Sequence, residues 1–544
     1  MPVPSQGSPR PSRPRSGRPV VMPTDPTPLA ARGFRAWPRS AWLHVTARTV
    51  PVLQHTRAEL VGRLRAAQIP ADVSRVSRWE SGQHPVPPSA TAVYESETGM
   101  PPSRLLAVAR SLARSSGQGE ERACLDQVPP PADDVVDDIL ERAGRPEARV
   151  SGAEWLALAV AVCGFDHFYM PPPTWQQVCD RLVSELARTR GVDHHRRHEA
   201  CVTLLDHPVA QPHLLRSAGR WLTRRDVQVV TPVVSLLAEV DGPAASDVVL
   251  KLLRSSSRRL RAGTLGVVTT KLARGHLDGA AQHELEALCA RRLARTTSTS
   301  EALSTLDLAT HLPESSFDRL LSAMRHTGTR ESVLRAREHA SLVPVQTARG
   351  IGKRVGWAAQ LAVVGGSRTT PEPDLMLDRL VQEALFHVHG WRRALAGRTL
   401  GASPYADLVA DRALQLVEDD NKVVGLRAWG LLGSLGHGGR THELLERTLA
   451  ASDPERQREA LYALSLSPRP LTHTEAGSLV DLAARATEPD VRYGAVLTLG
   501  MTAPRHLDAV GDLDRASQRA VAWWHAAGPV LRDDDTTGAA GSAA

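Results

Sequence analysis

The sequence has few cysteines and no long apolar run. Its five cysteines form no CxxC pair and have no regular spacing, so we expect free or buried thiols in a reducing compartment: Cys124, Cys163, Cys179, Cys201 and Cys289. The longest apolar stretch, Trp155 to Phe165, is too short to span a membrane, and the N-terminus lacks the apolar core of a secretory signal. We therefore expect a cytoplasmic, nucleoid-associated protein without membrane contact.

Signatures of common enzymes and of cofactor or metal sites are also missing. No GxSxG, HExxH or dinucleotide fingerprint occurs, and Gly350 to Arg354 lacks the Walker spacing. His194 and His198 lie one turn apart, as metal ligands on a helix do, but no Cys or acid completes a four-ligand set. We expect a solvated first turn there. We predict no enzyme activity, cofactor or metal site.

Lysine is almost absent, since only Lys251, Lys271, Lys353 and Lys422 occur among 66 basic residues. Arginine is the usual basic residue, as in proteins encoded by the GC-rich genomes of actinobacteria. A single Arg is therefore weak evidence for DNA recognition. The distribution of charge along the chain is better evidence for DNA recognition. Residues 1–130 hold 17 Arg and 9 acids, whereas the remainder holds 49 basic and 50 acidic residues. This asymmetry is typical of a DNA-binding module attached to a neutral partner domain.

Residues 71–85 within this basic quarter predict a short helix with a polar outer face. Asp72 is a good N-cap, Gly82 suits a left-handed C-terminal position, and Pro85 prevents continuation. Val76 and Trp79 fall on one face and can anchor it, which leaves Ser and Arg on the free face. Such a helix suits insertion into the major groove of DNA.

The run Val76 to Gly82 (VSRWESG) resembles the recognition helix of XRE-type, lambda-repressor-like helix-turn-helix domains, and Thr56 to Leu60 is similar to their second helix. The resemblance implies double-stranded DNA as the partner and structural roles for Glu80 and Gly82. By position, it implies that Val73, Ser74 and Arg78 face bases and that Arg57, Arg75, Ser77 and Ser81 face phosphates or base edges. It covers about a tenth of the chain.

Two features depart from that family's pattern. The segment between Leu60 and Val76 is longer than the usual tight turn between the two helices by roughly five residues. In addition, Pro51 interrupts the stretch around Trp42 to Leu53 in which the first helix of the domain is expected. A degraded first helix would weaken the prediction of DNA binding, and an ordinary Arg-bearing surface helix is the alternative.

Composition predicts the domain limits. Residues 1–36 are rich in Pro, Ser, Gly and Arg and are expected to form a disordered tail, within which Met22 is an alternative start. The helix-turn-helix domain is predicted over residues 37–114, with further helices at Pro88–Glu97 and Ser103–Arg114. Residues 115–132 form a linker, 133–531 a helical-repeat domain and 532–544 a second disordered tail.

An internal repeat indicates the architecture of the second domain. Leu444, Leu445, Pro454, Ala460 and Leu464 recur 35 residues later as Leu479, Val480, Pro489, Ala495 and Leu499. An acid–Pro pair at a helix start, followed by apolar residues at three- and four-residue steps, is typical of a helical hairpin. With weaker copies at 193–205, 255–268 and 420–433, the pattern is similar to HEAT or armadillo repeats. The predicted fold is all-α, an α-solenoid behind a small helix-turn-helix domain; an irregular bundle or TPR-like array is the alternative.

Two functions remain open. One is a sequence-specific transcriptional regulator, whose repeat domain senses a ligand or protein partner or forms a homodimer so that two modules meet half-sites one DNA turn apart. The other is a protein-interaction scaffold, in which the concave repeat surface binds a protein and the N-terminal domain is vestigial or only localises it. The charge asymmetry favours the first, and the interrupted first helix favours the second.

Overall fold

The computed structural model describes residues 21–50, 55–116, 131–165, 168–364, 371–437, 439–511 and 513–533. Every regular element in these ranges is a helix, and their one strand-like pairing is an isolated bridge between Ser341 and His387. This confirms the all-α prediction. No helix in the same ranges combines the length and apolarity that a membrane span needs.

Five helices form the N-terminal module: α1 (Ala36–Thr49), α2 (Arg57–Ala66), α3 (Val73–Glu80), α4 (Pro88–Glu97) and α5 (Arg104–Ser116). The prediction of a degraded first helix was wrong, because α1 is complete and ends before Pro51. Pro38 lies in its first turn, where no N–H is needed for an intrahelical bond. Helix α1 packs on α3, α4 and α5, and its Trp42 is fully buried.

Helix α3 begins and ends as its sequence predicts. The Asp72 carboxylate accepts a hydrogen bond from the backbone N–H of Arg75 at 2.6 Å. Gly82 has a φ of +72°, and a Cβ at this position would lie 2.8 Å from Cα of Pro38 in α1. Only glycine combines that conformation with that close approach. Val76 and Trp79 are buried against the module, as expected, so the opposite face of α3 is the free one.

The remaining helices form a long array. Its first half comprises α7 (Asp133–Ala143), α8 (Gly152–Gly164), α9 (Pro172–Arg188), α10 (Gly191–Leu205), α11 (Ala210–Leu222), α12 (Thr231–Val234), α13 (Leu236–Glu239), α14 (Pro243–Leu253), α15 (Arg258–Ala273), α16 (Gly279–Arg295) and α17 (Thr299–Thr310). Its second half comprises α18 (Glu314–Ala323), α19 (Thr327–His339), α20 (Val345–Val364), α21 (Leu375–Phe386), α22 (Gly390–Ala402), α23 (Ala406–Leu416), α24 (Lys422–Leu435), α25 (Thr441–Ala450), α26 (Pro454–Ser465), α27 (His473–Arg485), α28 (Pro489–Thr502), the 3₁₀ helix η1 (Pro504–Ala509) and α29 (Arg515–Ala527).

The predicted repeat corresponds to the hairpins α25–α26 and α27–α28. Pro454 and Pro489 occupy the first position of α26 and α28, where the missing N–H costs nothing. The acids before them differ, because Asp453 caps its helix with a hydrogen bond and Glu488 does not. Helices α22, α24, α26 and α28 stack in succession, with α25 beside α27. Stacked helical hairpins are therefore confirmed in this half of the array.

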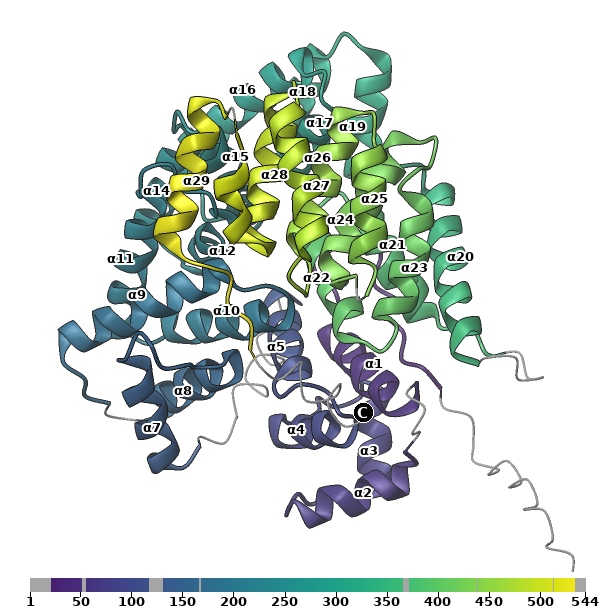
Figure 1. The fold of residues 1–544 in the computed structure, drawn as a ribbon. Helices are drawn as coiled ribbons and strands as arrows, with labels where there is room; N and C mark the ends of the chain where they lie inside the picture. Colours follow the sequence, from purple (N-terminus) through teal and green to yellow (C-terminus); the bar gives the residue numbers. More distant parts are fainter. Residues whose placement is uncertain are drawn as a thin grey trace, which may run out of the picture.

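The array is curved so strongly that its last helix meets its beginning (Figure 1). Trp523 of α29 packs edge-on against Trp221 of α11, with ring centroids 5.6 Å apart, and Arg519 pairs with Asp226 at 2.9 Å. Beyond α29 the chain runs back to α9 and α10, where Asp533 accepts hydrogen bonds from Arg197. The predicted C-terminal tail is wrong for residues 532 and 533, which are packed here; residues 534–544 lie outside the described ranges.

The N-terminal module lies in the opening of this curve and shares a core with the array (Figure 1). Arg39 of α1 forms a buried ion pair with Glu383 of α21 at 2.8 Å, and Arg114 of α5 pairs with Glu199 of α10 at 2.7 Å. The preceding segment packs as well, because Asp25 is buried against Arg39. The predicted disorder was therefore wrong for residues 21–36. Residues 1–20 and most of the predicted linker, 117–130, are outside the described ranges.

Candidate functional site

The α2–α3 edge of the module faces away from the array (Figure 1). Helices α1 and α5 contact α22, and α5 also contacts α10, so the docking uses the opposite side of the module. Val73 is 50% exposed, and Ser74 and Arg78 are also exposed on the first turns of α3. All three side chains proposed to face bases are therefore accessible to a large partner.

The structure assigns Arg57 a different role from the phosphate contact expected of it. Its guanidinium pairs with Glu80 at 2.7 Å, and Glu80 is almost completely buried. Arg48 of α1 pairs with the same carboxylate, and the hydroxyl of Tyr94 donates to it at 3.2 Å. Glu80 thus ties α3 to α1, α2 and α4, in line with its expected structural role. Arg57 belongs to this internal cluster rather than to a free cationic surface.

The other proposed phosphate contacts lie at the surface with local partners. Arg75 is exposed, donates to the carbonyl oxygen of Pro70 at 3.0 Å and lies 5.5 Å from the ring centroid of Trp79. Ser81 is exposed and donates to the carbonyl of Arg78, while Ser77 is half-buried. A hydrogen bond to a surface carbonyl is exchanged at little cost for one to a phosphate, because both are oxygen acceptors. Arg75 and Arg78 are the available cations of α3.

A groove of about 1080 Å³ opens on the inner side of the curved array. It is bounded by residues of α15, α17, α24, α26, α28 and α29, which are distant in sequence. Both charge signs and two tyrosines line it, with the guanidinium of Arg259 stacked 3.8 Å from the ring centroid of Tyr493. Ser298 and Ser300 of the opposite wall bind Glu455 of α26. Such contacts narrow the concave surface to a groove.

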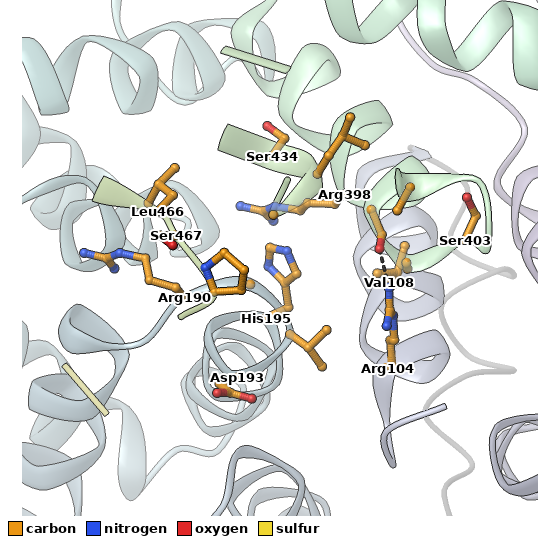
Figure 2. Close-up of a pocket in the computed structure, with 18 of the residues that line it drawn as sticks. Arg104, Val108, Arg190, Asp193, His195, Arg398, Ser403, Ser434, Leu466 and Ser467 are labelled. Carbon is orange, nitrogen blue, oxygen red and sulfur yellow. Dashed lines mark hydrogen bonds between the residues drawn. The ribbon is translucent and has the colours of Figure 1, made fainter. Parts of the chain in front are cut away.

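A second cavity, the junction pocket, lies where the module, the array and the C-terminal segment meet. Its volume is about 430 Å³, and it is lined by Arg104 of α5, Arg190 before α10, Arg398 of α22 and Arg532. Figure 2 shows the guanidinium of Arg398 beside the ring of His195, with Arg190 on one side and Arg104 on the other. Sequence reasoning missed these arginines because arginine is common throughout the chain and the four are far apart in it.

The histidine-rich start of α10 is not solvated as predicted, because His194 and His195 are half-buried and the turn that follows them is buried. Arg196, Arg197 and His198 are between 0% and 4% exposed. Arg197 pairs with Asp533 at 2.8 Å and with Glu185 at 3.0 Å, so the C-terminal segment covers this turn. Burial, together with neighbouring cations and imidazoles, holds the pKa of His195 well below its usual value and keeps the ring neutral.

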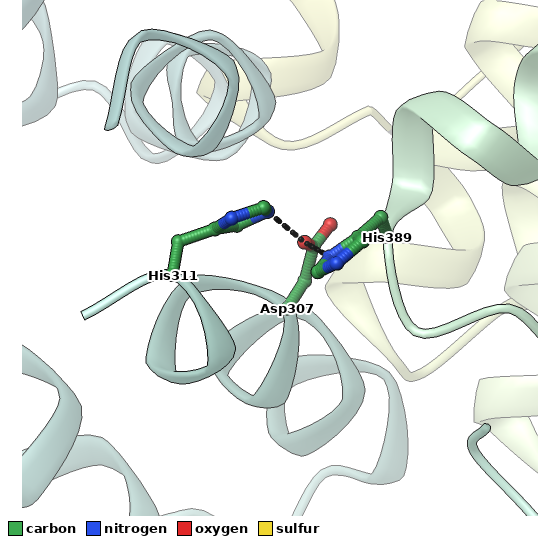
Figure 3. A group of neighbouring side chains, drawn as sticks. All are labelled: Asp307, His311 and His389. Atoms are coloured by element: carbon green, nitrogen blue, oxygen red, sulfur yellow. Dashed lines mark hydrogen bonds and ion pairs between the residues drawn. The ribbon is translucent and has the colours of Figure 1, made fainter. Parts of the chain in front are cut away.

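Asp307, His311 and His389 form a group that could be taken for a metal site (Figure 3). The imidazole of His389 lies 3.1 Å from one Asp307 oxygen, and the backbone N–H of Gly390 donates to the other at 2.7 Å. Burial and the His389 ring, which is stacked 4.1 Å away, lower the pKa of His311 to about 4. The carboxylate thus already fixes the N-terminus of α22 to the end of α17. We interpret the group as a clamp between these helices.

The four described cysteines are free thiols, in agreement with the sequence analysis. Cys179, Cys201 and Cys289 are buried, and Cys163 is exposed. Burial raises the pKa of both the Cys179 and Cys289 thiols to about 12, so they stay protonated and unreactive at neutral pH. Cys124 lies outside the described ranges. Cys179 and Cys289 are therefore part of the core and not a reactive site.

Comparison with known proteins gives no family for this chain. No family model matches it, and no curated protein does. Similar solved structures include a protein with a tumor overexpressed gene (TOG) domain array that recruits tubulin (12% identity, 69% of this chain and 87% of that chain, TM-score 0.20). An engineered protein is 15% identical over 72% of this chain and 98% of that chain, with a TM-score of 0.20. A structure of Kap95p with RanGDP is 10% identical over 91% of this chain and 68% of that chain, with a TM-score of 0.25. At these scores the likenesses carry no argument about function.

Proposed function

We propose that this protein is an interaction scaffold, in which the curved helical array holds a protein partner and the N-terminal module attaches the assembly to duplex DNA through α3. The observation that supports this most directly is the way the module is docked. Buried ion pairs fix α1 and α5 to the array, whereas the polar face of α3 is left free. A partner held by the array would therefore keep a fixed orientation to DNA held by α3.

The DNA contact is supported by the chemistry of α3. Arg75 and Arg78 can each neutralise a phosphate, and Ser74 can accept or donate toward a base edge. Helix α2 adds two exposed arginines, of which Arg63 pairs with Glu97 and Arg65 donates to the carbonyl of Ala71, while Asp72 is occupied in capping α3. This small surface predicts salt-dependent binding of modest strength, suited to localising a scaffold.

The protein partner is proposed to occupy the inner groove. Arg427 of α24 and Tyr462 of α26 line it, and Tyr462 is 48% exposed. Tyrosine and arginine are the residues that most often dominate binding energy at protein interfaces. The groove also contains the acids Glu301, Glu459 and Asp490. A partner segment with both charge signs and one aromatic anchor would fit this lining.

A second candidate function is that of a sequence-specific regulator, and the exposure of Val73 favours it. An apolar side chain at the start of a recognition helix can contact the methyl group of thymine, which is a base-specific contact. A homodimer would place two α3 helices on neighbouring half-sites. Sequence preference, rather than binding alone, separates this candidate from a localising module.

The deciding experiment uses the full chain with a pool of random duplex fragments at two salt concentrations, followed by sequencing of the bound fraction. The scaffold proposal expects binding that weakens with salt and no enriched motif, whereas the regulator expects a short enriched site. The double variant Arg75→Ala/Arg78→Ala should flatten the salt dependence by about two counterions. Arg291→Ala/Arg295→Ala, on the exposed side of α16, is the matched control and should bind as the parent does.

Absence of binding by the parent chain would refute the DNA contact and leave the array alone as the functional surface. Equal binding by the parent and the α3 variant would place the DNA contact elsewhere. The groove is tested separately, by selecting binding peptides against the parent chain. Tyr462→Ala should lose those that occupy the groove, and Tyr169→Ala, at a 90% exposed tyrosine outside the groove, should not.

A further inference from the structure

We propose that the junction pocket binds a small phosphorylated molecule. Four guanidinium groups converge on it from four separate segments of the chain, as described above. Among the described residues, none of the four forms an ion pair with a carboxylate. Three of them donate to neutral acceptors: Arg104 to the carbonyl of Gly401, Arg532 to that of Pro468, and Arg190 to the carbonyls of Ala187 and Thr189 and the sulfur of Met501. Arg398 has no hydrogen bond to another described residue. Arg39, Arg114 and Arg197, by contrast, each pair with a carboxylate.

The four arginines are half-buried, and cations withdrawn from water without a carboxylate partner are costly, so their accumulation in one cavity needs an explanation. The Nε atoms of Arg104 and Arg190 are buried without a hydrogen-bond partner. Burial lowers the pKa of all four guanidiniums, that of Arg190 to about 10. Arg196 lowers the pKa of Arg104 further, and Arg532 that of Arg190. A bound polyanion would supply the missing negative charge, and guanidinium groups pair well with phosphate oxygens.

The rest of the lining suits the same class of ligand. The hydroxyls of Ser403, Ser434 and Ser467 add polar atoms to the lining, where they bond to Leu400, Gly430 and Thr441, and α10 begins at the pocket with Gly191. A helix N-terminus adds partial positive charge and N–H donors, which reinforces a site already built from arginines. Val108 and Leu466 provide an apolar wall for an organic group. The volume of about 430 Å³ fits a metabolite-sized molecule and not a macromolecule.

The acids of the lining do not cancel this charge. Asp193 accepts a hydrogen bond from the backbone N–H of Asp533 at 3.0 Å, and burial, together with the neighbouring Asp533 carboxylate, raises the pKa of Asp193 to about 6. Asp407 lies 3.6 Å from Arg440 and also acts on Arg104, as Asp193 acts on Arg532. These two acids offset only part of the charge of the four arginines. The neutral His195 next to Arg398 adds a further nitrogen without adding repulsion. The pocket as a whole therefore favours an anion.

The test is isothermal titration of the full chain with inorganic pyrophosphate, against potassium chloride at the same ionic strength. We expect saturable binding by the parent chain and a rise in its unfolding temperature of at least about 2 °C. Arg398→Gln should reduce the affinity at least about tenfold, since a charge-assisted pair to phosphate is lost. Arg295→Gln, an exposed cation of α16, should bind like the parent.

Without ligand, Arg398→Gln should unfold at the same temperature as the parent or higher, because it removes a half-buried charge that has no ion pair among the described residues. A variant that binds pyrophosphate more weakly but unfolds no earlier than the parent has lost binding and not folding. Arg532→Gln, on the C-terminal segment, is the second variant and should also weaken binding. A parent chain that responds no more to pyrophosphate than to chloride, or undiminished binding by both variants, would overturn the proposal. Neither result affects the α3 contact with DNA, which is measured independently.

Discussion

Replacing Arg39 by methionine tests how firmly the N-terminal module is held by the array. Arg39 is 1% exposed and donates four hydrogen bonds, two to Asp25 and two to Glu383. Methionine of similar length removes the charge but fills most of the volume. Asp25 is then left without an ion pair among the described residues, while Glu383 keeps Arg379 and Arg392. Removing one partner of a buried ion pair costs about 3–5 kcal/mol, which we expect here.

The pH dependence gives this prediction a second check. Arg39 lowers the pKa of both Asp25 and Glu383 in the folded protein. A carboxyl with a lowered folded-state pKa contributes stability above its usual value, near pH 4, and loses that contribution as the pH falls further. The stability gap between the parent and Arg39→Met should therefore be largest near neutral pH. It should narrow progressively below about pH 4.

Urea denaturation gives the free energy of unfolding, and hydrogen exchange followed by mass spectrometry gives the protection of α1 and α21 separately. The second measurement matters because a chain of this size need not unfold in one step. Arg254→Met breaks an exposed pair with Glu284 and serves as control, with little expected loss of stability because water screens exposed ion pairs. If Arg39→Met cost no more than this control, or if α1 and α21 kept their protection, the buried ion pair would not be what holds the module.

Two further perturbations test local features. Glu95 is buried and accepts backbone N–H groups at the start of α5, and burial raises its pKa to about 7. The stabilisation by the protonated Glu95 carboxyl is complete below its usual pKa and is lost as the pH rises through about 7. The stability of the parent relative to Glu95→Gln should therefore fall by about 3 kcal/mol from about pH 4.5 to 8. A difference in stability that does not change with pH would contradict the raised pKa. A Cβ at Gly500 would lie 2.2 Å from Trp524, so Gly500→Ala should cost about 1–3 kcal/mol and loosen α29 in hydrogen exchange, whereas Gly477→Ala, with open space around it, should be neutral. Equal stability of the two glycine variants would show that α29 adapts freely.

The sequence by itself determined the class of fold and the form of several elements, because these depend on local periodicity and capping. Asp72, Gly82 and Pro454 act on backbone groups within a few residues of themselves, so their roles at helix ends follow from short-range chemistry. The buried face of α3 also followed from the spacing of Val76 and Trp79. The prediction of a degraded first helix from Pro51 was wrong because a helix can begin earlier and end before a proline, as α1 does.

Only the tertiary structure decided which polar residues would be buried together. Arg39 and Glu383 are separated by 344 residues, and Arg197 and Asp533 by 336, so no local pattern links them. The same holds for the four arginines of the junction pocket, which are ordinary in a chain where arginine is nearly the sole cation. Whether an arginine is a solvated side chain, a phosphate contact or half of a buried ion pair depends on which carboxylates folding brings to it. That is set by the curvature of the whole helical array.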